Sequence, residues 1–144
     1  MRRLLAILAA AASLSAAPLA AQARPPLSDV LDNLADLWAR GDAGAIAGLT
    51  SASGVDIEIA GVAMGSISGR KLSAALRRIF DERVTVSVVS RMTSPVQGVE
   101  DRAFGELSWR VRLGGATVAE STTVFLALIH EPVGWRVTQI RILE

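Results

Sequence analysis

Acid–base chemistry in this chain would depend on carboxylates and arginines, because the other usual catalytic side chains are scarce. The 144 residues include no cysteine, no tyrosine and one histidine, His130. The lack of cysteine excludes disulfides, a thiolate nucleophile and cysteine-based metal sites. Nothing stands at ligand spacing from His130, so no metal or cofactor is expected. Glu106 and Arg110 are the candidates on one predicted strand, and Glu120 is the candidate on the next; a carboxylate held beside an arginine can act as a general base.

The same charged residues also have a structural interpretation. Glu106 and Arg110 alternate with the apolar side chains of residues 103–113, so we expect them on the outer face of a strand. Cross-strand pairing with Glu120 would then explain these charges without catalysis. His130 precedes a predicted turn, where a side chain lies at a rim or on the exterior. These observations favour a protein without enzymatic activity. The alternative is a small isomerase, dehydratase or hydrolase that uses Glu106 or Glu120 with Arg110.

The first 23 residues have the pattern of a cleaved export signal. Two arginines follow Met1, residues 4–17 form an uncharged run, and Ala21-Gln22-Ala23 places small side chains before a cleavage site. The run is shorter than the roughly 20 apolar residues of a membrane-spanning helix, and Pro18 interrupts it. We predict cleavage between Ala23 and Arg24. The product would be periplasmic or secreted, with no stable membrane anchor after cleavage.

Residues 24–144 have the length of one domain. After removal of the signal, 13 basic residues face 14 acidic ones, so the net charge is −1. No basic stripe interleaved with aromatic residues remains. Nucleic acid is therefore not expected as a partner.

Arg40-Gly41-Asp42 matches the tripeptide that integrins recognise, but its neighbours favour a joint between two helices. Apolar side chains recur at helical spacing from Asp29 to Arg40, with Ser28 as the predicted N-cap. Gly41 can adopt the left-handed conformation that ends a helix. Asp42 can then cap a second, shorter helix. We interpret the tripeptide as a structural joint.

Beyond the joint the pattern changes to strands, with one further helix among them. Residues 55–59 alternate, and a turn within residues 61–65 leads to a second short strand. A helix over about residues 70–81 follows, and its outward cations form either a binding patch or a solvated face: Arg70, Lys71, Arg77 and Arg78. Long alternating runs then predict an antiparallel sheet, with a hairpin turn at Gly114-Gly115. These runs cover residues 84–92, 103–113, 117–130 and 135–143.

Three local motifs carry a resemblance to a known family. They are Leu37-Trp38-Ala39-Arg40-Gly41-Asp42, Ile67-Ser68-Gly69-Arg70, and Gly134-Trp135-Arg136-Val137 with Ile140-Arg141. In order they are similar to the family's joint between helices one and two, the start of its third helix and its final strand. By these motifs the chain resembles the nuclear transport factor 2-like superfamily, the cone-shaped α+β fold of ketosteroid isomerase, scytalone dehydratase and many polyketide cyclases. The resemblance implies three N-terminal helices packed on a curved, mainly antiparallel sheet.

The resemblance also implies an apolar cone that is open at one end. Enzymatic members place an Asp or His base and Tyr or Asp donors inside it, and this chain lacks such a set. We therefore expect a small apolar ligand in the cone, or a protein partner at the sheet face, including a second copy of the chain. Bulky residues on converging elements are the cavity candidates, with ordinary core packing as the alternative: Trp38, Leu76, Phe80, Leu107, Trp109 and Trp135.

Overall fold

A computed structural model describes residues 25–144, so the predicted export signal and its cleavage site lie outside the described residues. Within them the chain forms three helices and six strands. Their order is α1 (Leu27–Ala39), α2 (Ala43–Gly48), β1 (Val55–Ile59), β2 (Val62–Ile67), α3 (Gly69–Asp81), β3 (Arg83–Pro95), β4 (Arg102–Leu113), β5 (Glu120–Glu131) and β6 (Gly134–Leu143).

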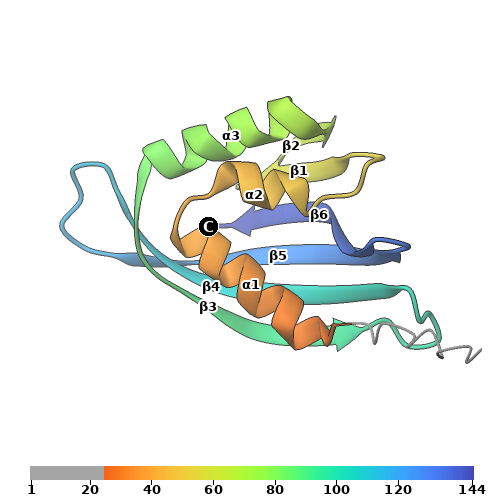
Figure 1. The fold of residues 1–144 in the computed structure, drawn as a ribbon. Coiled ribbons are helices and arrows are strands. Elements are labelled where there is room, and N and C mark those ends of the chain that lie inside the picture. Colours follow the sequence, from red (N-terminus) through yellow and green to blue (C-terminus); the bar gives the residue numbers. More distant parts are fainter. Residues whose placement is uncertain (1–24) are drawn as a thin grey trace, which may run out of the picture.

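The six strands form one curved sheet, and the helices lie on its concave side (Figure 1). The strand order is β2-β1-β6-β5-β4-β3; β1 and β6 run parallel, and every other neighbouring pair is antiparallel. β3 carries two register shifts, and bulges of this kind bend a strand and increase its twist. The predicted α+β architecture, with three helices on a mainly antiparallel sheet, is confirmed.

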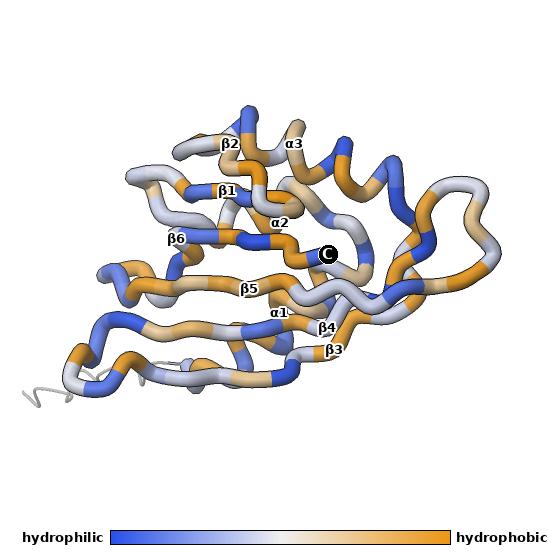
Figure 2. Tube along the Cα trace, turned by 180° about the vertical axis from the view of Figure 1, so that it is seen from behind, coloured by the Kyte–Doolittle hydropathy of each residue, from blue (hydrophilic) through white to orange (hydrophobic). Residues whose placement is uncertain are grey.

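Alternating side chains place the core between the sheet and the helices. In β4, five of the six residues predicted to face inward are buried, and the sixth, Leu113 at the end of the strand, is exposed; the five are Ala103, Gly105, Leu107, Trp109 and Val111. Alternation of hydrophobic and hydrophilic residues is also visible along β6 in Figure 2. The buried face of α1 covers this part of the sheet with Leu31, Leu34, Leu37 and Trp38.

The predicted joint between α1 and α2 is confirmed. Gly41 has a φ of +64°, its N–H donates to the Trp38 carbonyl at 3.0 Å, and the Asp42 N–H donates to the Leu37 carbonyl at 3.0 Å. These two bonds are the Schellman arrangement that satisfies carbonyls at a helix end. The Asp42 carboxylate accepts the Ala45 N–H at 3.0 Å and so caps α2. The tripeptide is built into two helix ends.

Three local predictions were wrong. α1 begins at Leu27 with Pro26 as its N-cap, so Ser28 lies inside the first turn and caps nothing. The turn between β1 and β2 is made by Ala60 and Gly61, both at positive φ, which is the backbone of a two-residue hairpin.

The third error concerns the connection between β4 and β5. β5 begins at Glu120, so the connection occupies residues 114–119 and is longer than a tight turn at Gly114-Gly115. The longer connection places Glu120 opposite Val111.

Candidate functional site

Three aromatic rings fill the interior of the cone. Trp38 contacts Phe80 and Trp109 edge to face, with ring centroids 5.3 and 5.7 Å apart, and Phe80 lies 6.1 Å from Trp109. Leu76 and Leu107 are fully buried in the same core. Five of the six predicted cavity residues therefore pack against one another or their neighbours; their contact with a ligand stays a prediction.

The two buried tryptophans differ in their hydrogen bonding. The Trp109 Nε1–H donates to the Thr85 hydroxyl at 3.0 Å. The Trp38 Nε1–H is buried and has no hydrogen-bond partner among the described residues. A buried donor without a partner costs free energy. Trp38 therefore stabilises the fold through its packing alone.

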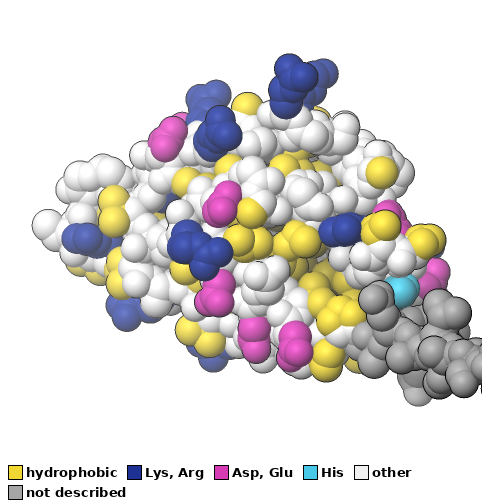
Figure 3. Space-filling view, in the orientation of Figure 1, with side chains coloured by type: hydrophobic (Ala, Val, Ile, Leu, Met, Phe, Trp, Pro, Cys, Tyr) yellow, Lys and Arg dark blue, Asp and Glu magenta, His cyan; other side chains and the backbone are white. Residues whose placement is uncertain are grey.

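The sixth candidate, Trp135, is half-buried at the mouth of the cone. It lines a hollow of about 360 Å³ between the start of α1, the end of α2 and the β5–β6 turn. Val30 and Leu49 complete an apolar lining, and the polar groups of Asp29, Asn33 and Arg136 stand beside it. The volume lies within the roughly 300–1,000 Å³ of small-molecule sites. Figure 3 shows hydrophobic side chains exposed on this face of the molecule.

Backbone and side-chain contacts fix this mouth. The Val137 N–H donates to the Leu49 carbonyl at 2.9 Å, and Arg136 Nη1 donates to the Gly48 carbonyl at 3.3 Å. The ring of His130 meets that of Trp135 edge to face at 5.2 Å, so His130 lies at the rim. Leu49 and Arg136 carry no sequence signal as site residues, because they come from segments distant in the chain.

The carboxylate–arginine candidates do not come together. Glu106 and Arg110 share the outer face of β4, but four residues along a strand separate them by about 13 Å. Glu120 opposes the buried Val111, so it lies on the helix side of the sheet, and Ser121 is the residue beside Arg110. Among the described residues, no ion pair joins Glu106 or Glu120 to Arg110. The predicted cross-strand pairing was wrong, because residues opposite one another on paired strands share a face, and Glu120 stands opposite an inward residue.

The outer face of the sheet carries other contacts. Arg141 on β6 forms two bonds of 3.0 and 3.1 Å with the carboxylate of Glu58 on β1. The rings of Phe104 and Phe125 lie 5.3 Å apart. Other apolar side chains are exposed at Val84, Val89, Met92 and Leu143.

The described part of the chain meets neither the requirements of a metal site nor those of a membrane-spanning helix. Within residues 25–144 there is no group of three His, Asp or Glu side chains placed to hold a metal ion. The helices there are also too short or too polar to cross a membrane.

Comparisons with known proteins agree on the fold. A DUF4783 family protein from Bacteroides uniformis is 12% identical, with a TM-score of 0.66, over 80% of this chain and 96% of that one. A domain of unknown function with a cystatin-like fold from Nostoc punctiforme is 18% identical, with a TM-score of 0.59, over 80% and 72%. An NTF2-like protein with a cystatin-like fold from Novosphingobium aromaticivorans is 17% identical, with a TM-score of 0.53, over 80% and 77%. No family model and no curated protein matches the sequence.

Proposed function

This chain has the nuclear transport factor 2-like, cystatin-like fold, and we propose that it is a non-enzymatic binding domain that acts outside the cytoplasm. The ligand would be small and largely apolar, and it would occupy the mouth of the cone. The observation that carries this proposal is the hollow beside Trp135, where a residue predicted to bind ligand meets open space. Trp38, Phe80 and Trp109 occupy the interior behind it. The export pattern of residues 1–23 supports the compartment.

The neutral dye N-phenyl-1-naphthylamine, which fluoresces in apolar surroundings, tests the mouth. We expect the protein to bind it, and Trp135→Ala to weaken binding about tenfold, because a large aromatic contact at a binding site is lost. Leu113→Asn is the control, since Leu113 is half-exposed and lies outside the lining of this hollow. Thermal melts establish that both variants are folded. Equal dye binding by the wild-type protein and Trp135→Ala would refute the mouth as the ligand site.

A second candidate function is self-association through the outer face of the sheet. It is favoured by the Phe104–Phe125 contact and the neighbouring exposed Met92. We expect size-exclusion chromatography with light scattering to give a dimer, and Phe104→Glu to give a monomer, because a charge in an apolar interface is costly. Val118→Glu, in the connection between β4 and β5, should leave the dimer intact. A wild-type monomer at micromolar concentration contradicts this candidate.

A further inference from the structure

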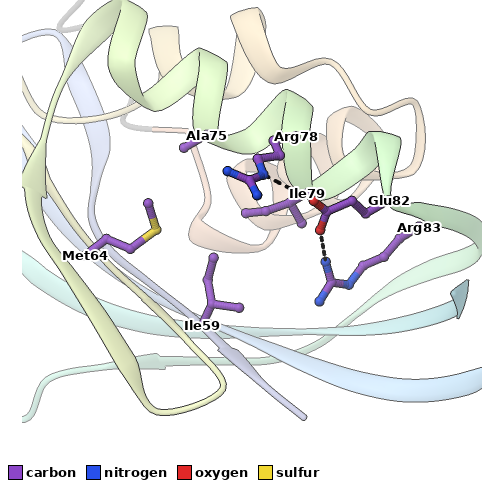
Figure 4. Close-up of a pocket in the computed structure, with 7 residues that line it drawn as sticks. All are labelled: Ile59, Met64, Ala75, Arg78, Ile79, Glu82 and Arg83. Carbon is purple, nitrogen blue, oxygen red and sulfur yellow. Dashed lines mark hydrogen bonds and ion pairs between the residues drawn. The ribbon is translucent and has the colours of Figure 1, made fainter. Parts of the chain in front are cut away.

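A second apolar hollow lies between α3 and the β1–β2 hairpin. It measures about 270 Å³, and its walls are Ile59 and Met64 on the hairpin and Ala75 and Ile79 on α3 (Figure 4). We call it the α3–hairpin groove. It shares no lining residue with the mouth of the cone, so its occupancy does not depend on the function proposed above.

A β-bulge accounts for one wall of the groove. Ile57 pairs with Gly65 and Glu58 pairs with Ala63, so Met64 is the extra residue on β2. Gly65 has a φ of +76°, a conformation that suits glycine at such a bulge. Bulges re-aim side chains, and the Met64 side chain lines the groove while remaining 49% exposed. A flexible methionine in this position can adapt to an alkyl chain.

The other end of the groove is charged, and its two arginines are held differently. Arg83 is 12% exposed and contacts Glu144 at 2.5 Å and Glu82 at 3.8 Å. Arg78 is 83% exposed, and its single ion pair is with Glu82, at 3.2 Å and one helical turn away. An exposed pair of this kind contributes little to stability. Arg78 can therefore exchange this carboxylate for an anionic ligand group.

The surroundings of Arg78 add to the positive charge. The exposed face of α3 also carries Arg70, Lys71 and Arg77. Figure 3 shows Lys and Arg side chains gathered over this helix. Against these cations stand the carboxylate of Glu82 in the groove lining and that of Asp81 on the helix, so positive charge is in excess. Apolar walls with an excess of cations at one end are complementary to a molecule that has an apolar chain and a negative head.

We propose that the α3–hairpin groove binds a monomeric, single-chain amphiphile with an anionic head, such as a fatty acid. The alkyl chain lies between Met64 and Ile79, and the carboxylate contacts Arg78. One chain is the limit, because 270 Å³ is below the roughly 300–1,000 Å³ of ordinary small-molecule sites. The groove is also recessed between a helix and a hairpin, a shape that suits a single chain better than a flat bilayer surface.

Titration with decanoate, against decyltrimethylammonium as a probe of equal chain length and opposite charge, tests the proposal. We expect decanoate to bind about tenfold more tightly than decyltrimethylammonium, because the cations at the groove attract the carboxylate head and repel the ammonium head. In NMR spectra the Met64 methyl resonance should shift while the Trp135 indole N–H does not. This readout separates the groove from the mouth of the cone, so failure at one site is distinguishable from failure at the other.

Two matched pairs of variants complete the test. Met64→Gln should weaken decanoate binding about tenfold, because an amide would line the apolar wall; Val62→Gln, at an exposed position of the same strand outside the groove lining, should not. Arg78→Gln should weaken it about threefold, and Arg77→Gln, outside the groove lining, should not. Equal binding of the cationic probe, or an unchanged affinity in Met64→Gln, would overturn the proposal. So would binding to phosphatidylglycerol vesicles without binding of monomeric decanoate, which would identify a membrane-contacting surface.

Discussion

Replacing Trp38 with alanine should lower the free energy of unfolding by about 3–5 kcal/mol, the cost of deleting a large aromatic side chain from a core. Trp38 is 1% exposed and contacts both other rings of the aromatic cluster. Its Nε1–H makes no hydrogen bond among the described residues, so the loss would come from packing and from the cavity left behind. Urea unfolding followed by circular dichroism measures the change.

Two further measurements identify the cause of this loss. Trp38→Phe should cost much less, because it keeps a ring in the cluster and removes the buried donor that has no partner. Indole added to Trp38→Ala should raise the melting temperature by refilling the cavity, and it should leave the wild-type protein unchanged. If Trp38→Ala were as stable as the wild type, the cone interior would not be packed as described.

The second large effect is expected at Gly105, against which the α1 residue Leu31 packs. A Cβ added there would lie 2.6 Å from Leu31 Cδ2 and 3.0 Å from Leu31 Cγ, with Cδ1 closer still. Leu31 is fully buried, so its side chain has no free space into which it could rotate. Gly105→Ala should therefore destabilise the protein by about 1–3 kcal/mol, as overpacking does in other cores. Chemical denaturation gives the value.

A double-mutant cycle tests the proposed clash at Gly105. Leu31→Ala removes the atoms that the new methyl group meets, so adding Gly105→Ala to that variant should cost less than adding it to the wild type. Gly48→Ala is the control, because an added Cβ at that position meets nothing within 4 Å. Additive effects of the two substitutions would mean that Gly105 matters for another reason, such as the flexibility of β4.

Sequence patterns predicted the elements better than their connections. The alternation of residues 103–113 identified the buried face of β4 correctly except at Leu113, because the apolar side chains can be buried only on the side that the helices cover. The pair Gly114-Gly115 favoured a tight hairpin, yet the connection continues to residue 119. A glycine pair permits a turn but does not determine the register of the strands that it joins. The longer connection moved the partner of Glu120 along the same inward face, from Trp109 to Val111, and Arg110 lies on the opposite face.

The site was harder to predict than the fold for a physical reason. A side chain that lines a cavity and one that fills it are both bulky, apolar and inward-facing. The sequence pattern therefore does not distinguish the role of Trp38 from that of Trp135. What distinguishes them is their surroundings in the fold: Trp38 packs against Trp109 in the interior, and Trp135 lines an open hollow. The mouth also takes residues from α1, the end of α2 and β6, and their meeting depends on the complete fold.

The position of β6 in the sheet has a consequence for the timing of folding. β6 lies between β1 and β5, and it alone joins the β2-β1 pair to the β5-β4-β3 group. Residues 134–143 are the last strand to be synthesised, yet both halves of the sheet must pair with them. A nascent chain can form its helices and separate hairpins, but it cannot close the sheet until this strand is available. The chain order therefore delays complete folding until residues 134–143 have been synthesised.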